Sequence, residues 1–64
     1  MSPATTAWLA SVRAEVAAPG SLMAIVTGTV RGQPRRVAIF PNDVVGKTDD
    51  ELFAFIRARL AERA

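Results

Sequence analysis

The chain has no cysteine, no histidine and no tyrosine, and these absences limit the chemistry that it can perform. General acid–base or nucleophilic catalysis would fall to carboxylates, to Lys47 or to hydroxyl groups. No disulfide can stabilise the fold, and no histidine or thiolate can hold a metal ion. We therefore expect a protein that is not an enzyme and that uses no cofactor and no metal.

Long apolar runs are missing as well. No stretch approaches the ~20 apolar residues that cross a bilayer. The first six residues lack the basic start and the unbroken apolar run of a signal peptide. The absence of cysteine fits a reducing compartment. Together these features predict a cytoplasmic protein.

The length predicts one small domain, residues 1–64. A domain of this size buries only about 60% of the surface that its unfolded chain exposes. Its stability margin is thin, because the usual disulfide or metal support is missing. We therefore expect a homo-oligomer or a complex with a protein partner.

The net charge of +2 is too small to indicate nucleic-acid binding by itself. The placement of the charges is more informative, because they are polarised along the chain. The basic residues gather at a predicted hairpin tip and near the end of the chain, with acidic residues between these two groups: Arg31, Arg35 and Arg36, then Asp43, Asp49, Asp50 and Glu51, then Arg57, Arg59 and Arg63.

The apolar periodicity predicts an α+β fold with the order α-β-β-α. The expected elements are a helix at about residues 4–18, strands at about 22–30 and 35–40, and a helix at about 49–62. A lone hairpin is only marginally stable in water, so both helices must cover it. We expect the two helices to pack on one face of this single antiparallel β-hairpin.

The first helix has two possible starts. Either Ser2 caps it with Pro3 in the first turn, or it begins a little later, at Thr5 or Thr6. In both cases it ends before the pair Pro19-Gly20, which cannot continue a helix.

An apolar stripe runs along this helix. Leu9, Val12 and Val16 recur at helical spacing and indicate a face that packs against the core. Trp8 lies beside the stripe, which favours a place in the core. A binding anchor is the alternative role for Trp8, since tryptophan is enriched at interfaces.

Side chains alternate between the two faces of a hairpin, so the length of the turn decides which of them share a face. With two or four loop residues, the core face carries Leu22, Ala24, Val26, Gly28, Val30, Val37 and Ile39. The opposite face then carries Thr27, Thr29, Arg31, Arg36 and Ala38 toward the tip, and Met23, Ile25 and Phe40 at the base. An odd number of loop residues would exchange the faces. Because Pro34 lacks the N–H that closes a tight two-residue turn, we expect a looser loop from Arg31 to Pro34.

The second helix is indicated by both its cap and its apolar spacing. It follows a predicted connection at residues 41–47. Thr48 and Glu51 form a capping box. In such a box the Thr48 hydroxyl accepts a hydrogen bond from the Glu51 amide, and the Glu51 carboxylate accepts one from the Thr48 amide. The expected buried stripe is Leu52, Phe53, Ile56 and Leu60, with Phe55 partly covered at its side. The arginines near the end of this helix complement its dipole and need no ligand.

Gly46-Lys47-Thr48 before a helix resembles the end of a phosphate-binding loop. The first glycine of such a loop would fall at Pro41, and no strand of a parallel sheet precedes it. Thr48 is already explained as a helix cap. The sequence therefore predicts no nucleotide site.

The acidic residues also predict no site. Asp49, Asp50 and Glu51 are adjacent, but on a first helical turn they point in different directions and should stay solvated. Asp43 together with Asp49 or Asp50 shows no recognisable oxygen-ligand spacing for calcium or magnesium.

The tip arginines Arg31, Arg35 and Arg36 could contact phosphates or enter a major groove. Three charges give weak affinity unless oligomerisation multiplies them, and no aromatic residue interleaves with them to stack bases. The alternative is a solvated turn whose charges also protect the hairpin from edge pairing.

The order of these elements resembles a known family. The hairpin Val-Arg-Gly-Gln-Pro-Arg-Arg-Val-Ala-Ile-Phe and the helix Asp-Asp-Glu-Leu-Phe-Ala-Phe-Ile-Arg-Ala-Arg-Leu, with an amphipathic helix before them, are similar to the small head-completion (head–tail joining) protein W family of lambda-like tailed phages. The resemblance spans about residues 5–62. It implies an α-β-β-α fold and a non-enzymatic virion part, located in the host cytoplasm or the virion, that binds a ring of portal or adaptor subunits.

We expect a small binding or assembly protein, with a phage head–tail connector as its most concrete form. One alternative is an inhibitor, encoded by a phage or mobile element, that binds a host protein. Another is a small nucleic-acid-binding regulator that uses the arginine tip. The residues expected to bind the partner are Met23, Ile25 and Phe40 at the base of the hairpin and Arg31, Arg35 and Arg36 at its tip.

Overall fold

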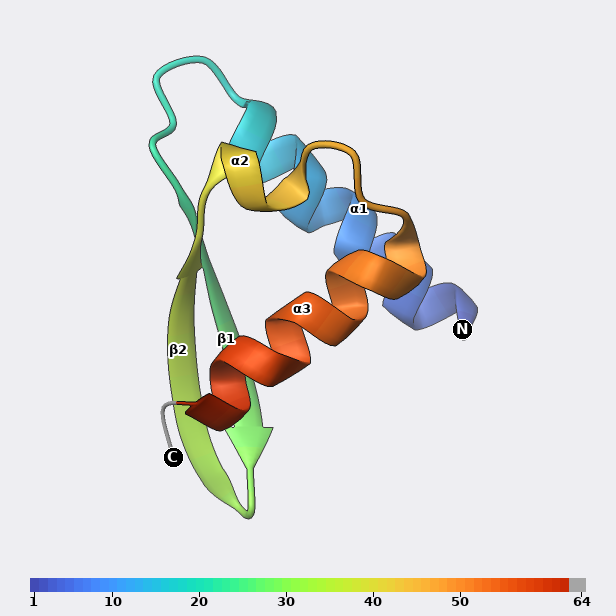
Figure 1. The fold of residues 1–64 in the computed structure, drawn as a ribbon, viewed down its shortest axis with the longest axis vertical. Coiled ribbons are helices and arrows are strands. Elements are labelled where there is room, and N and C mark those ends of the chain that lie inside the picture. The colour runs from blue at the N-terminus through green and yellow to red at the C-terminus, as the bar shows by residue number, and fades with distance from the viewer. Residues whose placement is uncertain (63–64) are drawn as a thin grey trace.

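The computed structural model describes residues 1–62, and it confirms the α+β fold. Helix α1 (Pro3–Ala17) is followed by strands β1 (Ala24–Val30) and β2 (Gln33–Ile39), a short helix α2 (Pro41–Val44) and helix α3 (Asp49–Glu62). The strands form one antiparallel hairpin, and the helices lie together on one side of it (Figure 1). No helix within residues 1–62 has both the length and the apolar character needed to span a bilayer.

The hairpin turn is tighter than expected. Val30 pairs with Gln33, which leaves only Arg31 and Gly32 in the loop. Both have positive φ angles, 52° and 77°, which is typical of a type I′ turn. The preference for a looser loop was wrong, because Pro34 lies one position beyond the pair that closes the turn and its missing N–H is not needed there.

Because the loop has an even number of residues, the core face of the hairpin carries side chains that the sequence predicted there. Ala24, Val26, Val37 and Ile39 are buried beneath the helices. Gly28 lies on the same face, where a Cβ atom would come within 2.7 Å of Leu60 Cδ1, so glycine allows α3 to approach the strand closely. The buried apolar core of residues 1–62 is Leu9, Val12, Val16, Ala24, Val26, Val37, Ile39, Val44, Leu52, Ile56 and Leu60.

Leu22 was predicted to lie in this core, and that prediction was wrong. Its side chain is 78% exposed, because β1 begins only at Ala24. Position 22 therefore lies two residues before β1, where no strand pairing holds its side chain against the helices.

Helix α1 starts at the earlier of its two expected positions. The hydroxyl of Ser2 accepts a hydrogen bond from the Thr5 amide at 3.2 Å, with Pro3 in the first turn. Leu9, Val12 and Val16 form the buried stripe, as predicted. Trp8 is half-buried at the edge of the core, so part of its ring remains accessible.

Helix α2 was not predicted. Pro41 occupies its first turn, where a missing N–H costs nothing. The Asp43 carboxylate accepts a hydrogen bond from the Phe40 amide at 2.9 Å, and Val44 is buried in the core. This single turn anchors the middle of the expected connection to the fold.

Helix α3 has the predicted capping box and bounds. The Thr48 amide donates to Glu51 Oε1 at 2.9 Å, and the Glu51 amide donates to Thr48 Oγ1 at 3.2 Å. Its buried side chains are Leu52, Ile56 and Leu60, whereas Phe53 is only half-buried, like Phe55. Arg63, which was expected in the last turn, lies outside the described residues.

Candidate interaction surface

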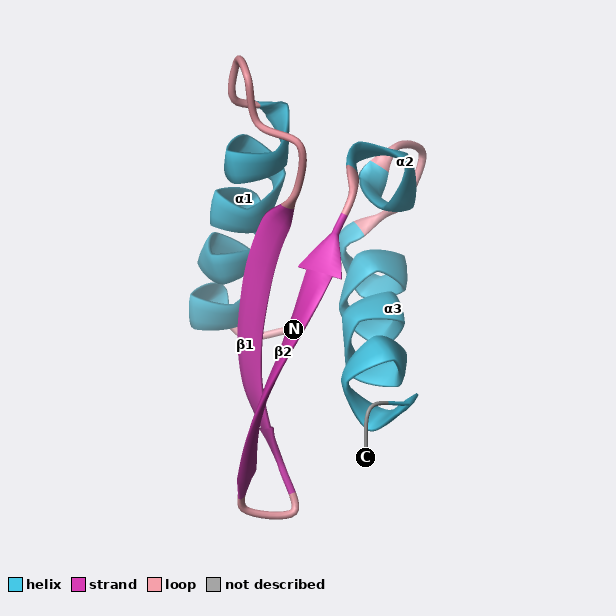
Figure 2. Cartoon of the chain, turned by 90° about the vertical axis from the view of Figure 1, so that its left-hand side faces the viewer, coloured by secondary structure: helices cyan, strands magenta, loops and turns pink. Residues whose placement is uncertain are grey.

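One face of the hairpin has no other element in front of it (Figure 2). The apolar residues predicted to bind a partner lie at the base of this face and are exposed: Met23 at 38%, Ile25 at 53% and Phe40 at 42%. Extending the strand register by one residue places Met23 opposite Phe40, next to the Ile25–Ala38 pair. We call Met23, Ile25 and Phe40 the outer patch.

The rest of this face, toward the tip, is polar. Thr27 is paired with Arg36 and Thr29 with Pro34, and all four residues are exposed. The face therefore divides into an apolar base and a polar tip, as the sequence predicted. Leu22 adds a further exposed apolar side chain just before the outer patch in the chain.

The hairpin does not bring the three tip arginines to one surface. Arg36 lies on the outer face, and Arg31 lies in the turn. Arg35 is paired with Gly28 on the core face and is half-buried. Because Arg35 and Arg36 point to opposite sides, they cannot both line one groove for a nucleic acid.

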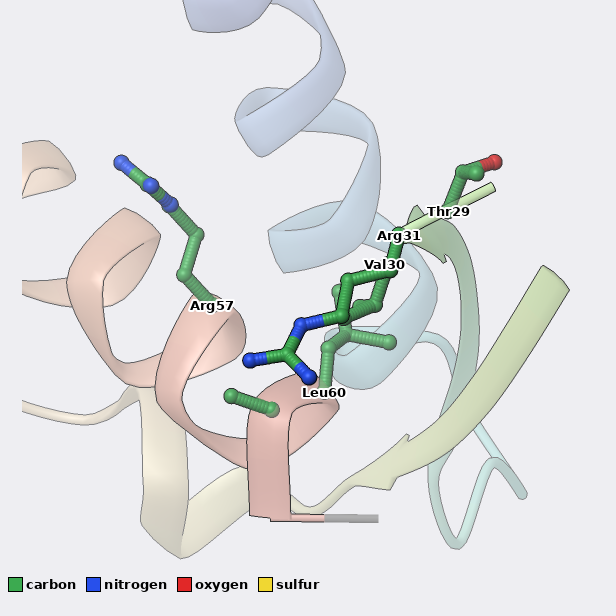
Figure 3. A pocket seen from close by; sticks show the side chains of 6 residues that line it. Thr29, Val30, Arg31, Arg57 and Leu60 are labelled. Atoms are coloured by element: carbon green, nitrogen blue, oxygen red, sulfur yellow. The ribbon is translucent and has the colours of Figure 1, made fainter. Parts of the chain in front are cut away.

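A shallow hollow lies between the tip and the last turns of α3. Thr29, Val30 and Arg31 line it from the hairpin, and Arg57, Leu60 and Ala61 line it from the helix, around a volume of about 310 Å³. The Arg31 guanidinium lies near Leu60, while the Arg57 side chain extends away from Arg31 (Figure 3). The two cations therefore do not converge on one point, and the hollow offers no site for a single anion.

Arg13 has a structural role that the sequence did not reveal. Its guanidinium donates to Asp49 Oδ1 at 2.9 Å from Nη2 and 3.3 Å from Nε, and Nη2 also donates to the Lys47 carbonyl at 3.0 Å. The prediction that Asp49 stays solvated holds only in part, because its side chain is 46% exposed but its carboxylate is paired with Arg13. This contact joins α1 to the start of α3, and these positions are 36 residues apart in the chain.

Lys47 is also accounted for by the fold. Its ammonium nitrogen lies 4.8 Å from the centre of the Phe55 ring. The guanidinium of Arg59 lies 5.7 Å from the same ring, and that of Arg57 lies 5.7 Å from the Phe53 ring. These cation–π contacts cover aromatic faces that the core leaves half-exposed.

The carboxylates of Asp43, Asp49 and Glu51 have separate structural partners. Asp43 accepts from the Phe40 amide, Asp49 binds Arg13 and Glu51 caps α3. Within residues 1–62, no three carboxylates come close enough together to hold a metal ion.

Glu51 gives the cap a pH dependence. The backbone amide of Thr48, and next the Thr48 side chain, hold the pKa of Glu51 below its ordinary value of 4.5. A lowered folded-state pKa contributes stability above the unfolded-state pKa, and this contribution is lost as the pH falls through the folded-state pKa. Glu51→Gln should therefore differ from the natural chain most above about pH 4.5, and this difference should shrink on acidification.

Urea unfolding at a series of pH values measures this difference. Asp50→Asn provides the control, because Asp50 lies on the same helical turn and is exposed. A difference between Glu51→Gln and the natural chain that stays constant from neutral to strongly acidic pH would contradict the prediction.

Within residues 1–62, the uncovered hairpin face, with the outer patch at its base, is exposed to other molecules. The hollow at the tip is shallow, and Arg13, Lys47 and the carboxylates described above contact other parts of the fold. Comparison of the chain with models of protein families, with curated proteins and with solved structures gave no match.

Proposed function

We propose that this chain is a small, non-enzymatic protein that binds another protein through the outer face of its hairpin. The observation that carries this proposal is the outer patch, three large apolar side chains exposed on a face that no other element covers. Exposed apolar groups that lie together on one face indicate an interaction surface more strongly than the same groups scattered singly.

The shape of the face favours a macromolecule over a small ligand. Small-molecule sites are concave and bury most of the ligand, whereas a twisted two-stranded ribbon presents a convex or flat surface. Apolar residues surrounded by polar ones also match the usual division of a protein interface into core and rim. Here Thr27, Thr29 and Arg36 would form part of the rim.

A phage head–tail connector or head-completion component is the most concrete form of this function. Its support is the resemblance in element order, a helix, a two-stranded hairpin and a helix, together with the basic tip. The genes beside the one that encodes this chain provide a direct check. Genes for portal, capsid and tail proteins would support the connector, and their absence would oppose it.

Static light scattering tests the surface itself. The chain would be measured alone and mixed with the products of neighbouring genes, and we expect a mass above the 6.8 kDa of one chain. Met23→Glu and Phe40→Glu should abolish this association, because each buries a charge in an apolar interface. Circular dichroism should show unchanged helix content in both variants.

Ala54→Glu is the matched control, since it adds the same charge at an exposed position of α3. It should leave association intact. A complex that survives Met23→Glu and Phe40→Glu, or a chain that associates neither with itself nor with any neighbouring product, would contradict the proposal.

A further inference from the structure

The two layers of this fold differ in width. Neighbouring strands lie about 4.8 Å apart, whereas packed helices lie about 8–10 Å apart. Helices α1 and α3 lie behind the hairpin on its two sides, α1 beyond β1 and α3 beyond β2 (Figure 2). The two-stranded layer is therefore narrower than the layer of two helices behind it. As a result, α1 projects past the free edge of β1.

The free edge of β2 is poorly suited to pairing with another strand. In a two-residue hairpin the pair next to the turn is hydrogen-bonded and the pairs then alternate, so Pro34, Arg36, Ala38 and Phe40 direct their backbones outward. Pro34 has no N–H, and the Phe40 N–H already donates to Asp43. Arg36 adds a charge, which also protects edges.

The free edge of β1 has none of these protections. By the same alternation, Ile25, Thr27 and Thr29 direct their N–H and C=O groups outward. No loop or side chain within residues 1–62 forms a hydrogen bond to these groups. The strand, Ala-Ile-Val-Thr-Gly-Thr-Val, contains no charge and no proline. Such an edge is a template for an additional strand.

Trp8 lies on the side of α1 that faces this edge. Trp8 and Arg13 are five positions apart and project about 140° apart around the helix, with the buried stripe between them. Arg13 reaches the start of α3, so the opposite flank of α1, which carries Trp8, is turned away from α3. Helix α1 itself lies behind the β1 side of the hairpin (Figure 2). The half-buried ring of Trp8 offers an apolar contact for a strand that lies there.

We propose that an extended segment of a protein partner adds to the free edge of β1 as a third strand. The segment is uncharged along its middle, and its inward-facing side chains are apolar and rest on Trp8. This inference rests on the proposed function and specifies the partner's conformation and chemistry.

A second copy of this chain does not fit the same place. Pairing of two β1 strands would bring them within about 4.8 Å of each other. Each copy's α1 projects past that edge on the same side of the sheet, and two helices need about 8–10 Å between their axes. A single added strand avoids this overlap and covers α1 instead.

A random nonapeptide library displayed against the purified chain supplies the probe. We expect selected peptides to lack proline, to alternate apolar and polar residues and to change the emission of Trp8, the chain's single tryptophan. Amide exchange at Ile25, Thr27 and Thr29 should slow by about tenfold or more in the complex.

Backbone methylation identifies the edge without changing a side chain. In a chemically synthesised chain, N-methylation of Thr27 should weaken peptide binding by about tenfold. The methyl group removes the hydrogen bond that the Thr27 N–H would donate to the added strand, and it also blocks the close approach of that strand. N-methylation of Ala38, which lies on the β2 edge, is the matched control and should have no effect. Phe40→Glu should leave peptide binding intact while it abolishes association through the outer patch, so the two proposals fail separately.

Four results would overturn the inference. The library could yield no binder, the binders could leave the amides of β1 unprotected, or N-methylation of Ala38 could weaken binding as much as N-methylation of Thr27. A chain that forms dimers sensitive to Thr27 methylation would also overturn it, because the edge would then belong to a second copy.

Discussion

Replacing Leu52 by alanine is expected to destabilise the fold by about 3 kcal/mol, within the range for truncating a fully buried leucine. Leu52 is 0% exposed and lies in the first turn of α3, where the helix meets the core. A domain of this length has a free energy of unfolding of roughly 3–10 kcal/mol. The substitution therefore removes between about a third and all of the free energy of unfolding.

Urea unfolding followed by circular dichroism measures this loss. Val45→Ala is the matched control, because it shortens another apolar side chain that is 75% exposed. It should change the free energy of unfolding by less than about 0.5 kcal/mol. A cost below about 1 kcal/mol for Leu52→Ala would show that α3 is not held by this contact.

The second largest effect is expected at Arg13. Arg13→Ala removes the ion pair with Asp49 and the bond to the Lys47 carbonyl. Hydrogen bonds to charged groups contribute about 1.5–3 kcal/mol when buried. The Arg13 and Asp49 side chains are 33% and 46% exposed, so solvent screening reduces the expected cost to about 1 kcal/mol.

A double-mutant cycle isolates the pair. Arg13→Ala, Asp49→Ala and the double variant should show a coupling of about 0.5 kcal/mol that weakens at high salt. The part of the Arg13→Ala effect that persists in the Asp49→Ala background then reports the bond to Lys47. Purely additive effects of the two substitutions would mean that the ion pair contributes nothing to stability.

The elements with strong local signals could be predicted from the sequence. The Thr48–Glu51 box fixed the start of α3, and the spacing of Leu9, Val12 and Val16 identified the buried side of α1. These signals involve residues within a few positions of one another, so tertiary structure is not needed to interpret them. The outer patch followed from strand alternation in the same way.

Contacts between distant segments could not be predicted. Nothing near Arg13 in the chain indicates that it meets Asp49, because the angle between α1 and α3 decides that contact. The turn was misjudged for a different reason. Arginine rarely adopts a positive φ, so the sequence did not indicate that Arg31 would occupy the first position of a type I′ turn.

The hairpin tip and helix α2 lie at opposite ends of the molecule, whose longest extent is 33 Å (Figure 1). Arginines lie at the tip end, whereas Asp43 lies at the α2 end. Charges of opposite sign are therefore separated along the length of the molecule between the hairpin tip and α2. The electric field of an anionic surface would turn the basic tip toward that surface. Salt screens this field over about 8 Å at physiological ionic strength. Orientation before contact would thus be sensitive to salt, even for an interface made of apolar side chains.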